Sequence, residues 1–99
     1  MIKLFRVRGA SMHPEYGNGD YVLVRRYSKR PRGRQPQTGD DVICRHPKLG
    51  TILKRISAQT AQGVTLKGLN GLSSDSSAIG EVPYHLLAGR VVARIPQKH

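Results

Sequence analysis

Short runs of β-forming residues, separated by turn signals, constrain the fold of this chain more than any other feature. Apolar and β-branched residues recur in brief stretches that Gly, Pro and Asp interrupt. Helical periodicity is nearly absent, with at most one turn expected near Pro14 or over residues 84–87. An all-β fold, a small twisted barrel or ribbon-like sheet, is therefore predicted. The expected strands cover residues 2–8, 20–25, 41–46, 52–56, 62–67 and 86–95.

The size of the chain allows one such domain. Its 99 residues are predicted to form a single domain over residues 1–99 with one modest core. Cys44 is the sole cysteine, so no intramolecular disulfide can form and packing alone must hold the fold. The histidines, at positions 13, 46, 85 and 99, lack metal-ligand spacing with one another or with Cys44. We expect no metal ion and no other cofactor.

The chain is strongly basic. Lys and Arg number 17 against 6 acidic residues, a formal net charge of +11 that favours polyanionic partners or acidic surfaces. Much of this charge lies in an exposed loop predicted over about residues 25–38, which Pro31, Gly33 and Pro36 interrupt. We expect the loop to make peripheral contact with an acidic membrane or an acidic protein surface. Its basic residues are Arg25, Arg26, Lys29, Arg30, Arg32 and Arg34.

Nucleic acid is the competing partner for so basic a domain, since phosphates would bind the same side chains. Of the aromatic residues, however, only Tyr27 lies in the basic loop, whereas single-strand binders usually need stacking platforms on the binding face. Nucleic acid is therefore the less favoured partner. No segment approaches the roughly 18 apolar residues that a membrane helix needs. A cytoplasmic protein, soluble or peripheral, is expected.

Ser11 and Lys54 form a candidate catalytic pair. A serine hydroxyl becomes a nucleophile when a neighbouring base takes its proton, and an uncharged lysine can be that base. The lysine must then be desolvated, so that its pKa falls well below the ordinary value of about 10.4. Strand alternation turns Lys54 inward together with Ile52 and Ile56, which would supply that desolvation.

Ordinary roles exist for both residues. Lys54 and Arg55 can be a solvated basic pair, and Arg55 is expected on the outward face of the strand with Leu53. Ser11 can cap a short turn, because serine is common at such positions. The segments around the two residues decide between these roles.

Those segments resemble the successive motifs of bacterial type I signal peptidases, over residues 7–94. The chain is most similar to their short, soluble branch, the nickel-type superoxide dismutase maturation proteases. The resemblance implies the β-rich fold of signal peptidases and of the LexA C-terminal domain. It also implies a serine endopeptidase that cleaves an N-terminal extension or signal-like segment from a protein substrate. The motifs are Gly9–Pro14, Gly19–Val24, Gly39–Val42, Lys54–Ile56, Asn70 with Ser73–Ser76, and Gly89–Val92.

The resemblance also implies roles for individual residues. Ser11 would be the nucleophile and Lys54 the general base, while Met12 would form a wall beside the nucleophile. Ser73 and Asp75 would support the lysine. The substrate would add as an extended strand beside the site.

Oxyanion stabilisation is expected from the segment Gly9, Ala10, Ser11 and Met12. Some relatives place a serine hydroxyl where this chain has Gly9, so the backbone N–H of Ser11 must carry more of the stabilisation here. Gly9 fits a turn with a positive φ equally well.

Two departures from the family pattern concern the surroundings of the catalytic pair. The residue after Pro14, usually Thr or Ser, is Glu15, and the arginine usually found after Asp-Ser is replaced by Ser77. Asp75 then lacks its usual charge partner. Arg55 is the candidate to replace it and is assigned to the support of the site.

Other functions stay open besides nucleic-acid binding. A LexA-like autocleaving domain also combines Ser-Met with a later Lys-Arg, but it normally carries a cleavage site upstream of the serine. Only six residues precede Val7 here, so cleavage in trans is expected. A catalytically inactive relative is the remaining alternative.

Overall fold

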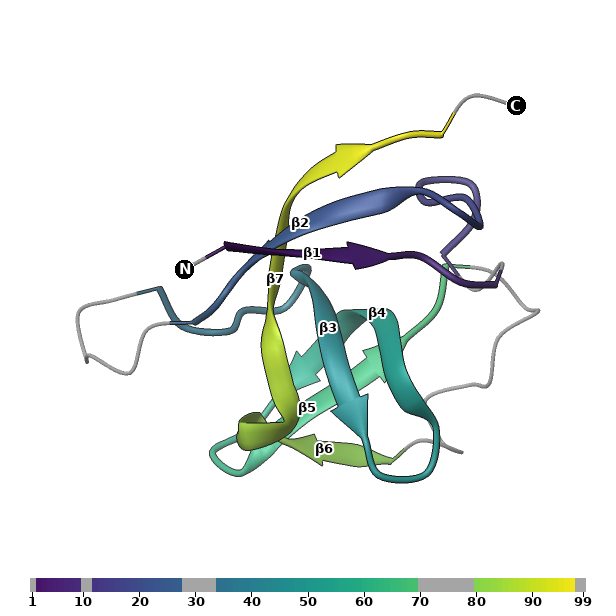
Figure 1. The fold of residues 1–99 in the computed structure, drawn as a ribbon. Helices are drawn as coiled ribbons and strands as arrows, with labels where there is room; N and C mark the ends of the chain where they lie inside the picture. Colours follow the sequence, from purple (N-terminus) through teal and green to yellow (C-terminus); the bar gives the residue numbers. More distant parts are fainter. Residues whose placement is uncertain (1, 10–11, 28–33, 70–79, 98–99) are drawn as a thin grey trace.

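The computed structural model describes residues 2–9, 12–27, 34–69 and 80–97, and within them the fold is all-β, as predicted (Figure 1). The strands form one antiparallel seven-stranded sheet in the order β1-β2-β7-β3-β4-β5-β6. A single 3-10 turn, η1, is the one helical element of the described residues. The elements are β1 (Ile2–Arg6), β2 (Tyr21–Arg25), β3 (Asp41–His46), β4 (Gly50–Gln59), β5 (Gly63–Lys67), β6 (Glu81–Pro83), η1 (Tyr84–Leu86) and β7 (Leu87–Ile95).

The hairpin expected around Gly50 is present and joins β3 to β4. Asp41 lies opposite Arg55 at its open end, and His46 lies opposite Gly50 at the turn. In the turn, His46 Nδ1 accepts hydrogen bonds from the backbone N–H groups of residues 48 and 49, both at 3.1 Å. The short strand β6 was not predicted, because three residues show no periodicity that a sequence pattern can reveal.

Strand β7 joins the two parts of the sheet. It pairs with β2 through residues 90–95 and with β3 through residues 87–90, and each ladder contains a register shift. Figure 1 shows β7 bending as it passes from the lower strands up to β2. Register shifts of this kind increase local twist, so the lower strands curl while β1 and β2 extend as a ribbon.

The β3–β4 hairpin is buried on both faces. Ile43 and Leu53 belong to one core cluster, whereas Val42 belongs to another. The prediction that Leu53 points outward is therefore wrong, since it is only 8% exposed. The reason is that residues 12–16 pack over that face. The first cluster comprises Val7, Met12, Tyr16, Val22, Val24, Ile43 and Leu53, and the second comprises Val42, Cys44, Ile56, Val64, Leu66 and Val82.

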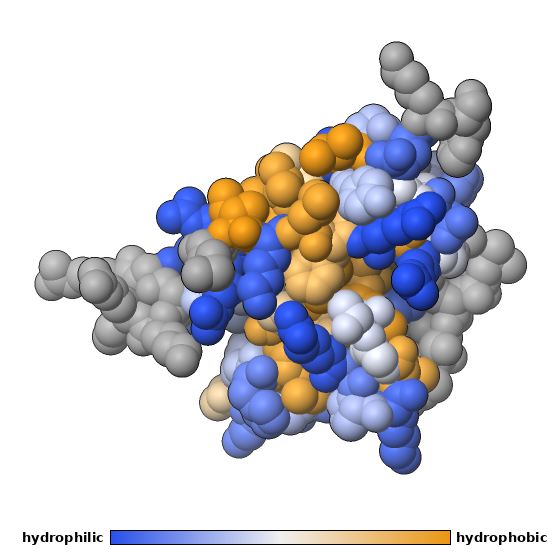
Figure 2. All heavy atoms as spheres, viewed as in Figure 1, coloured by the Kyte–Doolittle hydropathy of each residue, from blue (hydrophilic) through white to orange (hydrophobic). Residues whose placement is uncertain are grey.

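Strand β1 lies at one edge of the sheet. It pairs with β2 alone among the described strands, so its other edge has no strand partner there. Ile2 and Leu4 expose 55% and 56% of their surface. Figure 2 shows apolar atoms gathered over the upper part of this face, above a mostly hydrophilic lower part.

Gly63 is required where β5 meets β6. A Cβ atom at this position would lie 2.2 Å from the carbonyl oxygen of Val82, a clash that only backbone movement can relieve. We predict that Gly63→Ala lowers the free energy of unfolding by about 3 kcal/mol, measured by urea titration. Gly50→Ala is the control, because its site is open and only the positive φ of 76° opposes alanine, at about 1 kcal/mol. Equal losses from the two variants would contradict this account.

Candidate active site

Lys54 is a buried lysine in the middle of β4. It lies opposite Val42 of β3, and it is only 5% exposed. Burial lowers the pKa of its amine from the ordinary value, because the charged form loses hydration. The ion pairs of the described residues involve Arg34, Arg55 and Arg94, and none involves Lys54. Among these residues, desolvation therefore acts on the amine without a carboxylate to oppose it.

A cleft of about 630 Å³ opens beside Lys54. One wall is the chain leaving β1, residues 5–8, and the other is the first half of β4, residues 51–54. Ile43 and Leu49 complete the lining. Lys54 thus lines a depression between two extended segments.

Within the described residues, both walls of the cleft have a backbone edge that pairs with no other strand. Strand β4 pairs with β5 only from Arg55 onward, so within the described residues 50–54 pair with β3 alone. On the other wall, Val7 donates its N–H to the carbonyl of Asp20 at 2.7 Å and accepts from the N–H of Gly19 at 2.8 Å. Backbone groups alternate in direction along a strand, so residues 6 and 8 direct theirs to the opposite edge.

The segment expected to carry the nucleophile is described on both sides of Ser11. Ala10 and Ser11 themselves lie outside the described residues. Gly9 has a φ of 81°, as the turn interpretation expects, and its N–H donates to Asn18 Oδ1 at 2.9 Å. Met12 is 1% exposed and belongs to the same core cluster as Leu53, the residue before Lys54. The described flanks of Ser11 therefore approach the part of β4 that holds the lysine.

Of the residues predicted to support the site, only Arg55 lies within the described residues. Ser73 and Asp75 lie outside the described residues. Arg55 was predicted to point into solvent, and this prediction is wrong. Its side chain is only 26% exposed and is held by two carboxylates. Its Nε donates to Asp41 Oδ1 at 2.6 Å, its Nη2 donates to Asp41 Oδ2 at 3.1 Å, and the same nitrogen pairs with Glu15.

This clamp anchors the segment that follows Ser11. The hydroxyl of Tyr16 donates to Asp41 Oδ2 at 2.7 Å, and its backbone N–H donates to the carbonyl of Met12 at 2.9 Å. Burial, followed by the bond to Asp41, raises the pKa of Tyr16, which stays a donor. Asp41 and Tyr16 were missed from the sequence. The hairpin register was the signal for Asp41, because cross-strand neighbours of opposite charge pair directly.

Cys44 and the histidines do not assemble into a second reactive centre in the described part of the chain. Cys44 is fully buried in the second core cluster, and burial raises the pKa of its thiol to about 11. No group of three His, Cys, Asp or Glu side chains gathers there to hold a metal ion.

Three of the six basic residues of the predicted basic loop lie within the described residues. Arg25, Arg26 and Arg34 are exposed, and Arg34 pairs with Asp40 at 2.7 Å. Lys29, Arg30 and Arg32 lie outside the described residues. Tyr27 turns inward and donates to Asp40 Oδ2 at 2.8 Å.

The all-β fold agrees with a comparison to known families. The peptidase S24-like family model matches residues 2–92, and the chain belongs to this family. The family lies in the superfamily of LexA-type repressors and type I signal peptidases, which confirms the superfamily indicated by the sequence motifs. Membership supports a peptidase function of the serine type, on another protein or on its own chain. A comparison with curated proteins gave no match.

Within the described part of the chain, no helix is long and apolar enough to cross a bilayer.

Proposed function

We propose that this protein is a serine endopeptidase in which Ser11 is the nucleophile and Lys54 the general base, and that it removes an N-terminal extension from a protein substrate. The observation that carries the proposal is the burial of Lys54 in the lining of a cleft. A lysine with a lowered pKa has a neutral fraction that can accept a proton, which an exposed lysine lacks near neutral pH.

Acylation begins with proton transfer from Ser11 Oγ to Lys54 Nζ as Oγ forms a bond to the carbonyl carbon of the scissile peptide. The oxyanion that forms is stabilised by the backbone N–H of Ser11 and by neighbouring donors of residues 9–12. The C–N bond then breaks, and the protonated Lys54 gives its proton to the leaving amine. An acyl-enzyme ester on Ser11 remains.

Deacylation repeats these steps with water. Neutral Lys54 takes a proton from a water molecule, whose oxygen bonds to the ester carbonyl carbon. Ser11 Oγ then leaves and recovers the proton from Lys54, and the new carboxylic acid departs and loses its proton to solvent. The clamp of Arg55 on Asp41 and Glu15 supports this cycle by fixing the segment after the nucleophile.

The substrate is proposed to bind as an extended strand between the two free edges of the cleft. Residues 6 and 8 on one side and residues 50–54 on the other offer backbone groups to such a strand. Recognition through the backbone tolerates many side chains. Sequence preference then depends on the apolar lining, including Ile43 and Leu49.

N-methylation of a cleaved peptide tests this binding mode. The peptide is first selected from a fluorogenic library with the wild-type protein, and each amide is then methylated in turn. We expect slowing of about tenfold or more at consecutive positions near the cleavage site, because successive N–H groups of a strand face opposite edges and both edges of the cleft are proposed to pair with it. Methylation at these positions that leaves the rate unchanged would contradict strand addition.

The resemblance of the sequence motifs indicates to which branch of the superfamily the protein belongs. We propose the short branch typified by nickel-type superoxide dismutase maturation proteases, with cleavage in trans. The second candidate is self-cleavage, which the match to the peptidase S24-like family favours. Incubating active protein with an excess of the Lys54→Ala chain separates the two. Cleavage of the active chain at a rate independent of its concentration, with the Lys54→Ala chain left intact, supports self-cleavage within one chain, whereas cleavage of an added peptide or of the Lys54→Ala chain supports action in trans.

A further inference from the structure

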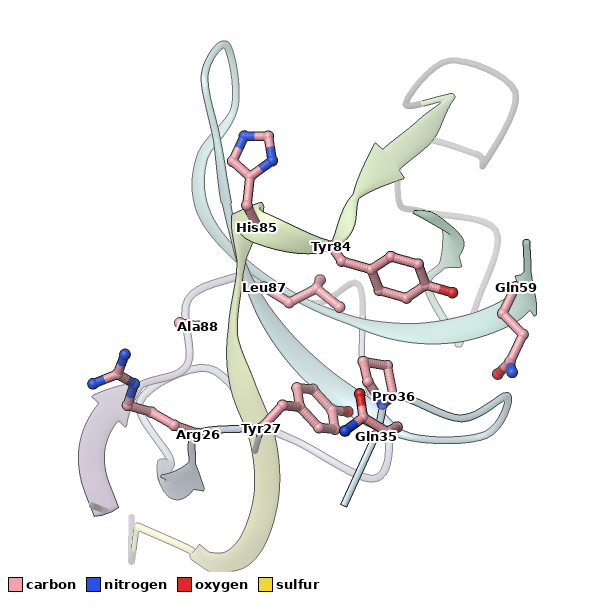
Figure 3. Close-up of a pocket in the computed structure, with 9 residues that line it drawn as sticks. All are labelled: Arg26, Tyr27, Gln35, Pro36, Gln59, Tyr84, His85, Leu87 and Ala88. Atoms are coloured by element: carbon pink, nitrogen blue, oxygen red, sulfur yellow. The ribbon is translucent and has the colours of Figure 1, made fainter. Parts of the chain in front are cut away.

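A second depression, of about 560 Å³, lies apart from the cleft beside Lys54 and shares none of its lining residues (Figure 3). Its walls come from the chain just after β2, the chain before β3, the end of β4, η1 and the start of β7. Figure 3 shows the rings of Tyr27 and Tyr84 with Leu87 between them, and Arg26 on the side away from Gln59. One half thus combines aromatic and apolar side chains with the carboxamides of Gln35 and Gln59, and the other half is basic.

The basic half continues into a smaller depression of about 340 Å³. The two depressions share Arg26, Leu87 and two further lining residues, so they form one groove. Lys3 and Arg45 extend the positive charge into this part. We define the basic–aromatic groove by Lys3, Arg26, Arg45, Tyr27, Tyr84 and Leu87.

The groove leads toward the cleft beside Lys54. The Arg45 guanidinium lies 5.9 Å from the centre of the Phe5 ring, and Phe5 lines that cleft. Lys3 and Phe5 occupy alternate positions of β1 and so share one of its faces. An extended chain bound beside Lys54 can therefore run past Phe5 into the groove.

Charge selects the occupant. Among the described residues, no acidic side chain lines either depression, whereas Lys3, Arg26 and Arg45 do. Asp40 contacts Tyr27 from outside the lining and is balanced by Arg34 at 2.7 Å. The basic half thus favours carboxylates, and the aromatic half favours an apolar side chain or a proline.

We propose that the basic–aromatic groove is a second binding site for the protein substrate, and that it holds an extended segment in which acidic residues adjoin an apolar or proline residue. This inference rests on the proposed endopeptidase function, which it deepens by assigning a chemical class to the substrate. The groove raises the affinity for a whole protein over that for a short peptide, because both sites bind one chain.

A peptide segment fits the groove better than single-stranded nucleic acid. Both tyrosine hydroxyls are used, Tyr27 on Asp40 and Tyr84 on the carbonyl of Thr60, and both residues are half-buried as parts of a wall. Base stacking requires open ring faces, with positive charge along the backbone path. Here the charge is confined to one half, and carboxamides of Gln35 and Gln59 line the other half.

Binding of a probe peptide to the Lys54→Ala protein tests the groove without any cleavage. The probe is a fluorescein-labelled peptide in which several aspartates adjoin a Leu-Pro pair, followed by anisotropy at about 0.15 M salt. We expect the double variant Lys3→Gln/Arg26→Gln to bind it about tenfold more weakly. Arg45 is left intact because it contacts Phe5 of the cleft. Replacing the Leu-Pro pair with Gly-Ser in the probe should weaken binding similarly.

The matched control is Lys48→Gln/Lys67→Gln, which removes the same charge from exposed positions outside the groove. We expect it to change affinity by less than about twofold. Equal weakening by both double variants would overturn the proposal in favour of general charge attraction. Tighter binding of a single-stranded oligonucleotide, with the same sensitivity to Lys3 and Arg26, would overturn it in favour of a nucleic-acid surface.

A second readout separates this inference from the proposed function. In the otherwise wild-type protein, Lys3→Gln/Arg26→Gln should raise KM for a substrate that carries the acidic segment and leave cleavage of a short peptide unchanged. Probe binding without any cleavage would refute the endopeptidase and keep the groove. Cleavage with no groove-dependent binding would refute the groove alone.

Discussion

Replacing Ser11 or Lys54 with alanine should abolish peptide cleavage, lowering kcat/KM by at least about a thousandfold. Without Ser11 there is no acyl-enzyme, and without Lys54 the serine keeps its proton. Because the two residues act in the same step, the double variant should be no slower than either single variant. The measurement is the initial rate on a fluorogenic peptide, with circular dichroism to verify the fold.

Two control variants distinguish the loss of the catalytic base from a loss of the folded structure. Lys67→Ala removes an exposed lysine of β5 that lies opposite Arg55, and it should leave the rate unchanged. Lys54→Met keeps the volume of the buried side chain without its base, so it should fold well and stay inactive. If Lys54→Ala keeps more than a few per cent of the wild-type rate, the base has been misassigned.

The rate should rise steeply with pH. Burial lowers the pKa of Lys54, and only the neutral amine can accept the serine proton. Below that lowered pKa, kcat/KM should increase about tenfold for each pH unit, and it should level off above it. A pH–rate profile on the fluorogenic peptide measures the inflection, which should lie below the ordinary lysine value of about 10.4. A flat profile between pH 5 and 9 would exclude a lysine base.

Unfolding measurements give an independent test of the same buried charge. The unfolded chain keeps the Lys54 proton up to about pH 10.4, whereas the folded chain loses it at a lower pH. Between those two pKa values the unfolded state binds more protons, so this residue makes stability rise with pH. Below the lowered pKa the cost of burying the charge is present in full.

Lys54→Met should therefore have a higher free energy of unfolding than the protein with Lys54 at neutral and lower pH. The difference in free energy of unfolding between the two should narrow toward pH 10. Urea titrations in a Ser11→Ala background measure this without interference from cleavage. A difference in free energy of unfolding that stays constant with pH would mean that Lys54 has the same pKa in the folded and the unfolded state.

The sequence alone determined the fold class and the setting of the lysine. Strand alternation and turn residues act over a few positions, so the hairpin of β3 and β4 could be predicted from its own residues. The same local rule placed Lys54 in a strand between Ile52 and Ile56, and the structure finds it buried there. Its motif context also indicated the superfamily to which the family match belongs.

The tertiary structure alone decided what covers each face of that hairpin. Leu53 and Arg55 were expected in solvent because a single strand does not reveal what packs on its second face. Pairing of β1 with β2 returns residues 12–16 to this face, where Glu15, 40 positions from Arg55 in the chain, completes the clamp. The basic–aromatic groove likewise joins β1, β2, β3 and β7. Local sequence patterns determine which residues form strands, whereas long-range packing determines which strands and loops contact one another. Both the clamp of Arg55 and the basic–aromatic groove consist of such long-range contacts, so they could not be predicted from the sequence.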